Sequence, residues 1–207
     1  MISIDRNTIY KTPRYSFKNF VQLSFEEKLN VLNWRNDINV RQWMYHSEVL
    51  QLDDHLKFVD GLSMRDDCYY WLVYDENEPI GVMNVTGVDK ESDKAELGYY
   101  LVPGLCGEGF FFVRECFFFF FEILKIKTFY GAVNEDNSEA IMLDRFFGCE
   151  FLSFKTLRQN EKEIRYWVCD DYSPMDFLEK YKLDVIDYIK YVKDENRKIR
   201  SRLCKSI

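Results

Sequence analysis

The stretch ELGYYLVPGLCGEGF, Glu96 to Phe110, decides the fold. A strand pattern ends just before its loop, and a Gly-x-Gly at Gly107 and Gly109 opens a Phe-rich helix. Glycines let backbone N–H groups approach a ligand, and a helix N-terminus is partially positive, so this loop predicts an anion site fitted to a pyrophosphate. The loop is neither the dinucleotide-binding Gly-x-Gly-x-x-Gly nor a P-loop. The alternative is that the glycines only end the strand tightly.

Hydrophobic periodicity predicts the elements on both sides of this stretch. Ser24 and Glu27 form a capping box that opens a helix, and two short helices follow near 40–45 and 53–62. We expect strands at 69–74, 80–88, 95–102, 128–133, 151–157 and 164–169, and helices at about 109–125 and 138–147. This order predicts an α+β fold of mixed α/β layers. The first fifteen residues show no assignable pattern.

Composition narrows the class of protein. The 207 residues carry a net charge of −7 and are 47% hydrophobic, which favours one compact core and disfavours nonspecific nucleic-acid binding. The longest apolar run, 110–124, contains three charged residues and predicts a buried helix rather than a membrane span. The six cysteines lack the spacing of zinc sites or disulfide frameworks, and the N-terminus lacks a signal-peptide pattern. We therefore expect a cytoplasmic protein with no metal, membrane or nucleic-acid partner.

The chain changes character from Pro174 onward. Val185, Ile189, Val192 and Ile199 recur at helical spacing and predict a long amphipathic helix. The last eleven residues carry five positive charges, which leaves −12 on the rest of the chain. We divide the chain into a domain at 1–172 and a C-terminal helical extension at 173–207. The basic end fits either a helix terminus with a solvated tail or an arm that packs on a partner subunit of a homodimer.

A second motif follows about thirty residues after the glycine loop. Asn137-x-x-Ala140-x-x-Leu143 heads a helix that Gly148 terminates. Together the two motifs resemble those of the GCN5-related N-acetyltransferase (GNAT) superfamily, over roughly residues 25–170. The resemblance implies a central, mostly antiparallel sheet flanked by helices and splayed between its fourth and fifth strands, here about 96–102 and 128–133. It also implies acetyl-CoA as co-substrate.

A narrower likeness lies in the N-terminal third. The runs WRN at 34–36, WMY at 43–45 and HLKF at 55–58 look like the N-acetyltransferases of the pseudaminic-acid pathway. That resemblance implies acetylation of the amino group of a UDP-linked 4-amino-4,6-dideoxy sugar in surface-glycan biosynthesis. Acetylation of a protein N-terminus, a polyamine or an antibiotic is an alternative. A non-catalytic binding module of the same fold is another, because two positions depart from the superfamily pattern.

The first departure lies in the cofactor loop, where superfamily members usually carry Arg or Gln at the position of Gly104. The resemblance assigns the pantetheine of acetyl-CoA to the gap between the splayed strands and its pyrophosphate to the loop N–H groups. Asn137 would contact the pantetheine, although Asn is also a favoured N-cap residue. The implied cofactor-binding residues are Leu101, Cys106, Gly107, Glu108, Gly109, Phe110 and Asn137.

The catalytic groups follow from the same resemblance. A neutral amine must attack the thioester, so a base must accept a proton, and Glu96 stands where many members carry a catalytic Glu. By alternation Glu96, Gly98 and Tyr100 share one face of their strand. A backbone N–H near Tyr100–Leu101 would bind the developing oxyanion. The alternative for Glu96 is an ordinary exposed strand residue.

The second departure is Asp144, which stands where a Tyr commonly protonates the leaving CoA thiolate. A carboxylic acid donates a proton there only if burial raises its pKa well above about 4. Otherwise Tyr100 or Tyr130 serves, or the thiolate leaves unassisted.

The acceptor site is predicted in the N-terminal third. Arg35 would bind a nucleotide phosphate, because a guanidinium pairs bidentately with phosphate oxygens. Met44, Tyr45, His55 and Phe58 would line the uracil and sugar pocket, with His55 forming a hydrogen bond. The alternative is that Trp43, Met44 and Phe58 belong to the helix-face core.

Overall fold

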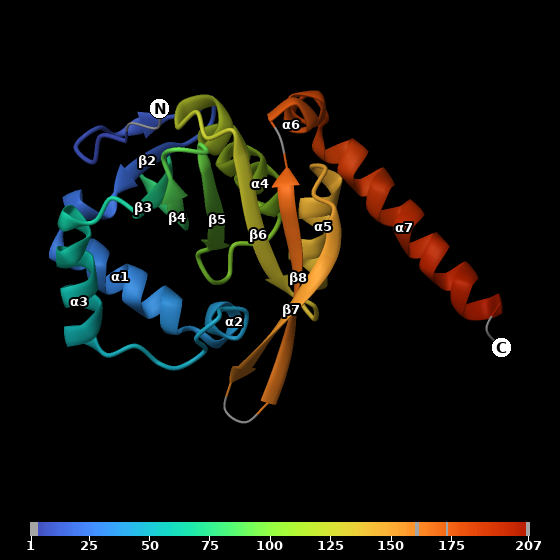
Figure 1. Ribbon diagram of the computed structural model, residues 1–207, viewed down its shortest axis with the longest axis horizontal. Coiled ribbons are helices and arrows are strands. Elements are labelled where there is room, and N and C mark those ends of the chain that lie inside the picture. The colour runs from blue at the N-terminus through green and yellow to red at the C-terminus, as the bar shows by residue number, and fades with distance from the viewer. Residues whose placement is uncertain (1–3, 160–161, 173, 206–207) are drawn as a thin grey trace.

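One eight-stranded sheet forms the centre of the computed structural model (Figure 1), which describes residues 4–159, 162–172 and 174–205. Its strands, in spatial order, are β1 (Tyr10–Lys11), β2 (Ser16–Asn19), β3 (Cys68–Asp75), β4 (Glu78–Asp89), β5 (Lys94–Leu101), β6 (Thr128–Asn134), β8 (Lys162–Tyr172) and β7 (Phe151–Gln159). Neighbouring strands are antiparallel except β5 and β6, which are parallel. The expected mostly antiparallel sheet is confirmed. Strand β1 lies within the first fifteen residues, where the sequence showed no pattern, and β2 was not predicted.

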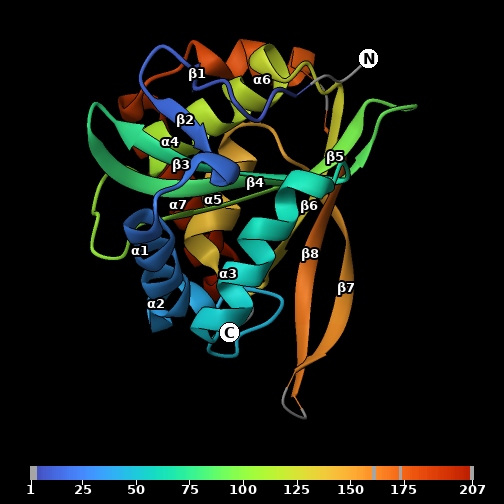
Figure 2. The same ribbon diagram turned by 90° about the vertical axis from the view of Figure 1, so that its left-hand side faces the viewer.

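Helices cover both faces of the sheet. On one side lie α1 (Phe25–Asn36), α2 (Ile38–Arg41) and α3 (Leu52–Gly61), as Figure 2 shows. On the other side lies α4 (Gly109–Phe118), and α5 (Ser138–Phe146) packs against it through Phe110 and Phe146, whose ring centroids are 5.8 Å apart. Short 3-10 turns follow β2 (Phe20–Gln22) and α3 (Leu62–Met64). The GNAT-type α+β architecture expected from the motifs is present.

The capping box at Ser24 forms as predicted. The Ser24 hydroxyl accepts from the Glu27 N–H at 3.2 Å, and the Glu27 carboxylate accepts from the Ser24 N–H at 2.6 Å. Asp37 then ends α1 with extended backbone and caps α2. The helix expected at 40–45 is shorter than predicted and lies earlier: α2 ends at Arg41, and turns follow.

The Phe-rich helix is core, as its composition indicates. It runs as α4 to Phe118 and widens into a π-helical segment, η3 (Phe119–Ile123). Phe119 stacks on Phe17 at 4.1 Å and meets Trp71 edge-on at 5.0 Å on the sheet side. Phe117 packs on Phe177 of the C-terminal extension at 5.8 Å. Because the helix is covered on two sides, it needs apolar residues around most of its circumference.

The sheet splays between β5 and β6. Their register covers only Lys94–Glu96 opposite Thr128–Tyr130, after which β6 continues beside β8. Backbone groups of residues 97–101 that point toward β6 therefore have no strand partner there, and they need partners of another kind. This opening was expected between the two strands and is confirmed.

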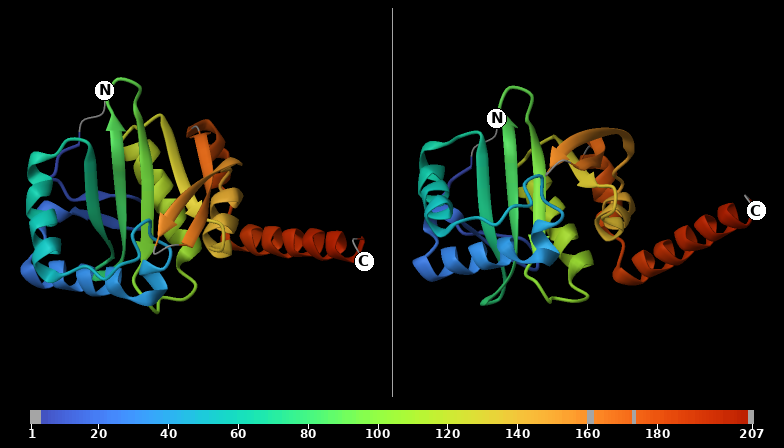
Figure 3. Two further views of the ribbon diagram at one scale, coloured as in Figure 1. Left: turned by 60° about the horizontal axis from the view of Figure 1, so that its bottom comes forward. Right: turned by 90° about the horizontal axis from the view of Figure 1, so that it is seen from below.

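The C-terminal extension consists of α6 (Pro174–Tyr181) and α7 (Val185–Lys205). Phe177 is fully buried against the main core, and Tyr188 stacks on Phe110 at 5.7 Å. The later turns of α7 project away from the body (Figure 3). The long amphipathic helix is confirmed, whereas the boundary at 172/173 stays a prediction. The side chains of Arg202 and Lys205 in the predicted basic arm lie outside the described residues.

Candidate active site

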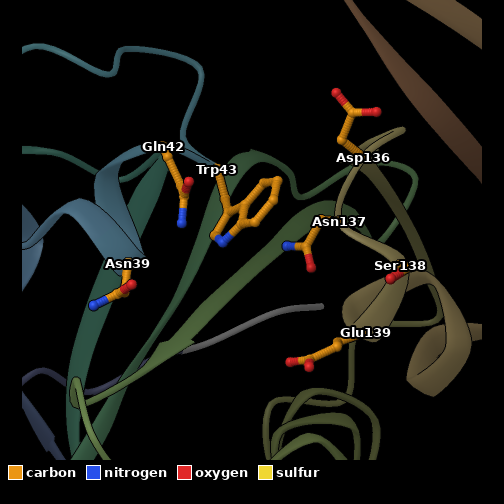
Figure 4. Close-up of a pocket in the computed structure, with 7 residues that line it drawn as sticks. All are labelled: Asn39, Gln42, Trp43, Asp136, Asn137, Ser138 and Glu139. Carbon is orange, nitrogen blue, oxygen red and sulfur yellow. The ribbon is translucent and has the colours of Figure 1, made fainter.

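A pocket of about 340 Å³ lies between α2 and the start of α5 (Figure 4). The side chains of Trp43 and Asn137 point into it from opposite walls. Its lining residues are Asn39, Gln42, Trp43, Asp136, Asn137, Ser138 and Glu139. Asn137 lies just after the C-terminal end of β6, the strand that diverges from β5, so the pocket is next to that end of the strand.

Asn137 is the N-cap of α5. Its Oδ1 accepts a hydrogen bond from the Ala140 N–H at 3.3 Å, which leaves the side-chain NH₂ to face the pocket. The capping role that the sequence suggested is therefore present. Its contact with pantetheine stays a prediction.

The glycine loop has the properties of an anion site. Gly104 and Gly107 adopt φ of +90° and +86°, a region that disfavours other residues, and a Cβ at either would meet open space. Within residues 4–159, the backbone N–H groups of Cys106 to Phe110 donate no hydrogen bond, and no side chain caps α4. These donors face an open surface at a helix N-terminus, where an anion is favoured.

An arginine that the sequence did not indicate lies beside this loop. Arg14 contacts the Glu108 carboxylate at 3.3 Å, and its guanidinium lies 4.2 Å from the centroid of the Phe111 ring. The Tyr15 hydroxyl donates to the same carboxylate at 3.2 Å. The loop itself has Gly104 where superfamily members usually carry Arg or Gln. The positive charge next to the Glu108 carboxylate therefore comes from Arg14, outside the loop.

Glu96 lies where β5 and β6 separate, held by groups from two distant segments. The Tyr45 hydroxyl donates to Glu96 Oε1 at 2.7 Å, and the Lys155 ammonium donates to the Tyr45 hydroxyl at 3.0 Å. Lys155 also lies 4.3 Å from the Tyr45 ring centroid. The structure thus brings together Glu96 and Tyr45, two predicted site residues, and adds Lys155 from β7.

The Tyr45 side chain is fixed by its surroundings. Its ring meets Tyr166 of β8 edge-on at 5.1 Å, and the buried Tyr166 hydroxyl donates to the Met44 carbonyl at 3.4 Å. Burial, with the bond to Glu96 adding to it, raises the pKa of Tyr45 above its ordinary value. Tyr45 therefore stays a neutral hydrogen-bond donor. Lys155 and Tyr45 are 110 residues apart, so no local pattern could have paired them.

Asp144 lies on α5 and binds Tyr99, which points to the opposite face of β5 from Glu96. The Tyr99 hydroxyl donates to Asp144 Oδ1 at 2.5 Å. Burial raises the pKa of Asp144 to about 7, although the bond from Tyr99 lowers it. Asp144 is therefore a carboxyl group that exchanges a proton near neutral pH, the condition that the sequence set for an acid at this position. Tyr99 was not predicted.

Two further tyrosines lie near Glu96. Tyr100 shares the Glu96 face of β5, and burial raises its pKa while the charge of Arg35 opposes that shift. Tyr130 is the β6 residue directly opposite Glu96. Among the described residues, neither hydroxyl forms a hydrogen bond with Asp144, and the roles of Tyr100 and Tyr130 as alternative acids stay predictions.

The predicted acceptor residues separate into two groups. Arg35 donates to the His46 carbonyl at 2.6 Å, while its Nη1 is buried without a hydrogen-bond partner in the described part of the chain. His55 instead lies buried between α3 and α1, with Nε2 3.0 Å from the Lys28 carbonyl. Phe58 packs edge-on against Tyr70 at 5.1 Å. For His55 and Phe58 these are structural contacts, and their substrate-binding roles stay predictions.

No helix among residues 4–159, 162–172 and 174–205 has the length and hydropathy that crossing a membrane requires. No group of three His, Cys, Asp or Glu side chains in the same ranges is arranged to hold a metal ion.

Comparison with known proteins gives consistent matches. Residues 20–150, more than half of the chain, match the family described as acetyltransferase (GNAT) domain. The acetyltransferase PseH of Campylobacter jejuni is 32% identical over 152 residues, which cover 73% of this chain and 90% of that protein.

Solved structures share the fold. The crystal structure of Campylobacter jejuni PseH in complex with acetyl coenzyme A matches with a TM-score of 0.55 at 23% identity, covering 76% of this chain and 99% of the other. The spermidine N-acetyltransferase of Vibrio cholerae, in complex with CoA and spermine, gives a TM-score of 0.64 at 16% identity, covering 82% and 99%.

Proposed function

The chain belongs to the GNAT acetyltransferase family, and we propose that it transfers the acetyl group of acetyl-CoA to the amine of a nucleotide-linked amino sugar, such as a UDP-linked 4-amino-4,6-dideoxy sugar. The observation that carries this proposal is Glu96, fixed by Tyr45 and Lys155 at the point where β5 and β6 separate. The 32% identity to an acetyltransferase PseH supports the choice of acceptor.

Acetyl-CoA would be bound by main-chain groups at both ends of the opening. The free N–H groups of Cys106 to Phe110 suit its pyrophosphate, and unpaired backbone groups of residues 97–101 suit its amide-containing pantetheine. The side-chain NH₂ of Asn137 faces the pocket between α2 and α5 and would contact the pantetheine there. A backbone N–H near Tyr100–Leu101 would bind the oxyanion that develops on the thioester carbonyl.

Glu96 would be the base. Tyr45 occupies Oε1, and no group in the described residues occupies Oε2, so Oε2 is available to the attacking amine. As the new N–C bond forms, the amine proton passes to Glu96. Lys155 donates to the Tyr45 hydroxyl and so holds Tyr45 in the position from which it binds Glu96.

Asp144 would be the acid. Because the pKa of Asp144 is about 7, its carboxyl group is protonated in a large share of the protein molecules at neutral pH. Tyr99 binds Oδ1, so Oδ2 is the oxygen from which the proton passes to sulfur as the C–S bond breaks. Glu96 and Tyr99 point to opposite faces of β5 because they are an odd number of residues apart. Base and acid therefore flank the opening that would hold the thioester.

Arg35 would bind the nucleotide part of the acceptor. Its buried, unpartnered Nη1 needs an acceptor atom, and a phosphate oxygen provides one. Arg35 and Arg41 donate to the carbonyls of the consecutive residues His46 and Ser47, so both guanidinium groups lie along the same loop. Two cations on one loop suit a diphosphate.

Isothermal titration with acetyl-CoA and, separately, with UDP tests this assignment. We expect both to bind the wild type, and we expect Arg35→Gln to weaken UDP binding at least about tenfold while acetyl-CoA binding is unchanged. The matched control is Arg158→Gln, at an exposed position of β7. Failure of the wild type to bind UDP would contradict the nucleotide-linked acceptor.

A cytoplasmic location and a homodimer also belong to the proposal. Exposed isoleucines on α7, at Ile186, Ile189 and Ile199, are the apolar surface that a second copy would cover. Sedimentation of the purified protein tests the homodimer.

A further inference from the structure

Asn84 is a polar residue in the middle of the sheet. It lies on β4, paired with Tyr70 of β3 on one side and Gly98 of β5 on the other. Residues 80–83 and Val85 around it on the strand are buried, whereas Asn84 is only half-buried. An amide in a central strand needs hydrogen-bond partners, or it must face an open site.

The position of the Asn84 amide is set by Gly98. A Cβ at Gly98 would lie 2.8 Å from both Nδ2 and Oδ1 of Asn84. The amide therefore fills the place on the sheet face that a side chain at position 98 would take. Since alternate residues of a strand share a face, that place lies between the side chains of Glu96 and Tyr100.

The amide has unused hydrogen-bonding capacity. The Asn84 side chain makes no hydrogen bond to any residue in the described ranges, although it offers two donors and one acceptor oxygen. Gly98 does not have a left-handed φ, so the backbone conformation does not require a glycine here. The glycine instead leaves room for the Asn84 amide. The pair Asn84–Gly98 thus presents a free carboxamide two residue pairs along the sheet from the proposed base, on the same face.

We propose that Asn84 is an acceptor-binding residue, whose carboxamide binds a hydrogen-bonding substituent, a hydroxyl or an acylamino group, next to the reacting amine. This inference rests on the proposed function, because an amine at Glu96 brings its neighbouring ring substituent over Gly98. An amide recognises such groups whether they donate or accept. It would orient the ring so that the amine points at the thioester.

Kinetics with a UDP-linked amino sugar and acetyl-CoA test the assignment. Asn84→Ala should lower kcat/KM for the sugar about 5- to 50-fold and leave KM for acetyl-CoA unchanged. Asn77→Ala, in the exposed β3–β4 turn, is the matched control and should be neutral. A sugar that lacks the neighbouring substituent should react equally well with the wild type and with Asn84→Ala.

The glycine allows a second, independent test. Gly98→Ala should displace the amide and lower kcat/KM by a similar factor, whereas adding Gly98→Ala to Asn84→Ala should change it less than about twofold. Additive losses, or an Asn84→Ala variant within twofold of the wild type, would overturn the assignment. If the wild type does not acetylate the sugar at all, the proposed function fails instead. Thermal unfolding of each variant separates these outcomes from loss of the fold.

Discussion

At the scale of single residues, the chemistry depends on burying one carboxyl group. Asp144 stands where the superfamily pattern has a tyrosine, and its pKa of about 7 lets it exchange a proton near neutral pH. A tyrosine hydroxyl is still present next to this position, because Tyr99 of β5 donates a hydrogen bond to Asp144 Oδ1. A buried Asp with a neighbouring Tyr thus takes the place of a single Tyr.

Tyr99→Phe tests this pair through the pH dependence of the rate. The bond from Tyr99 lowers the pKa of Asp144, so its removal should raise that pKa. Because the protonated form is the donor, kcat of the wild type should fall as pH rises above about 7, and in Tyr99→Phe this fall should occur at higher pH. In Asp144→Asn this fall of kcat with rising pH should be absent. If kcat of Tyr99→Phe falls at the same pH as kcat of the wild type, Asp144 is not the proton donor.

At the scale of elements, the N-terminus of α1 is tied to the sheet through Glu27. Burial raises the pKa of Glu27, but hydrogen bonds from Lys18, Tyr74 and Ser24 outweigh it and lower the pKa to about 2. The Lys18 ammonium lies 2.7 Å from Oε1 and comes from β2. This anchor positions the helix that carries Arg35 in its last turn.

Glu27→Gln should therefore destabilise the protein in a pH-dependent way. A folded-state pKa below the ordinary 4.5 stabilises the protein above that pH, and this contribution is lost as pH falls toward 2. At pH 7 we expect the free energy of unfolding of Glu27→Gln, measured in urea, to be about 2–3 kcal/mol lower than that of the wild type. This difference should become smaller below pH 4.5. Glu26→Gln, one residue earlier and exposed, should cost under about 0.5 kcal/mol at any pH. Equal costs for the two variants would contradict the anchor.

The glycine loop makes its own prediction. Gly107→Ala forces a side chain into a left-handed conformation inside the row of free N–H groups, so KM for acetyl-CoA should rise about tenfold or more. Gly104→Ala carries the same backbone strain but lies before these donors, and its effect on that KM should be smaller. Steady-state kinetics with the acceptor saturating measure both. Equal increases would indicate general loop damage rather than a cofactor site.

The sequence predicted elements better than contacts between them. The capping box, the glycine loop and Asn137 are local patterns, and each forms as expected. Lys155 and Arg14 reach the site from distant segments, and neither pattern nor spacing links them to Glu96 or Glu108. His55 makes a contact that the sequence did not indicate, because its Nε2 lies 3.0 Å from the Lys28 carbonyl of α1. Side-chain direction depends on packing, which periodicity alone does not determine.

At the scale of the whole molecule, the C-terminal extension divides into a packed and a projecting part. Tyr188 and Tyr191 of α7 contact Phe146 at 5.3 and 5.5 Å, and Phe177 of α6 is fully buried. Beyond Tyr191 the described residues of α7 contribute nothing to the core. The extension is therefore part of the folding unit only along its first half.

Two truncations test this division. Removal of residues 193–207 should leave Tm within a few degrees of the full chain and activity unchanged. Removal of residues 173–207 should unfold or severely destabilise the protein, because loss of a buried Phe alone costs about 3–5 kcal/mol. Calorimetry measures both, and a stable protein ending at residue 172 would establish 1–172 as an independent domain.

The most direct test of the central claim is the identity of the acetylated product. The purified protein is given acetyl-CoA with an equimolar mixture of a UDP-linked 4-amino-4,6-dideoxy sugar, spermidine and a peptide with a free N-terminus, and products are followed by mass spectrometry. We predict that one acetyl group is added to the nucleotide sugar alone, that added UDP inhibits this, and that Glu96→Gln slows it about 10²- to 10⁴-fold. Acetylation of spermidine or the peptide in preference to the sugar, or no acetylated product, would contradict the claim.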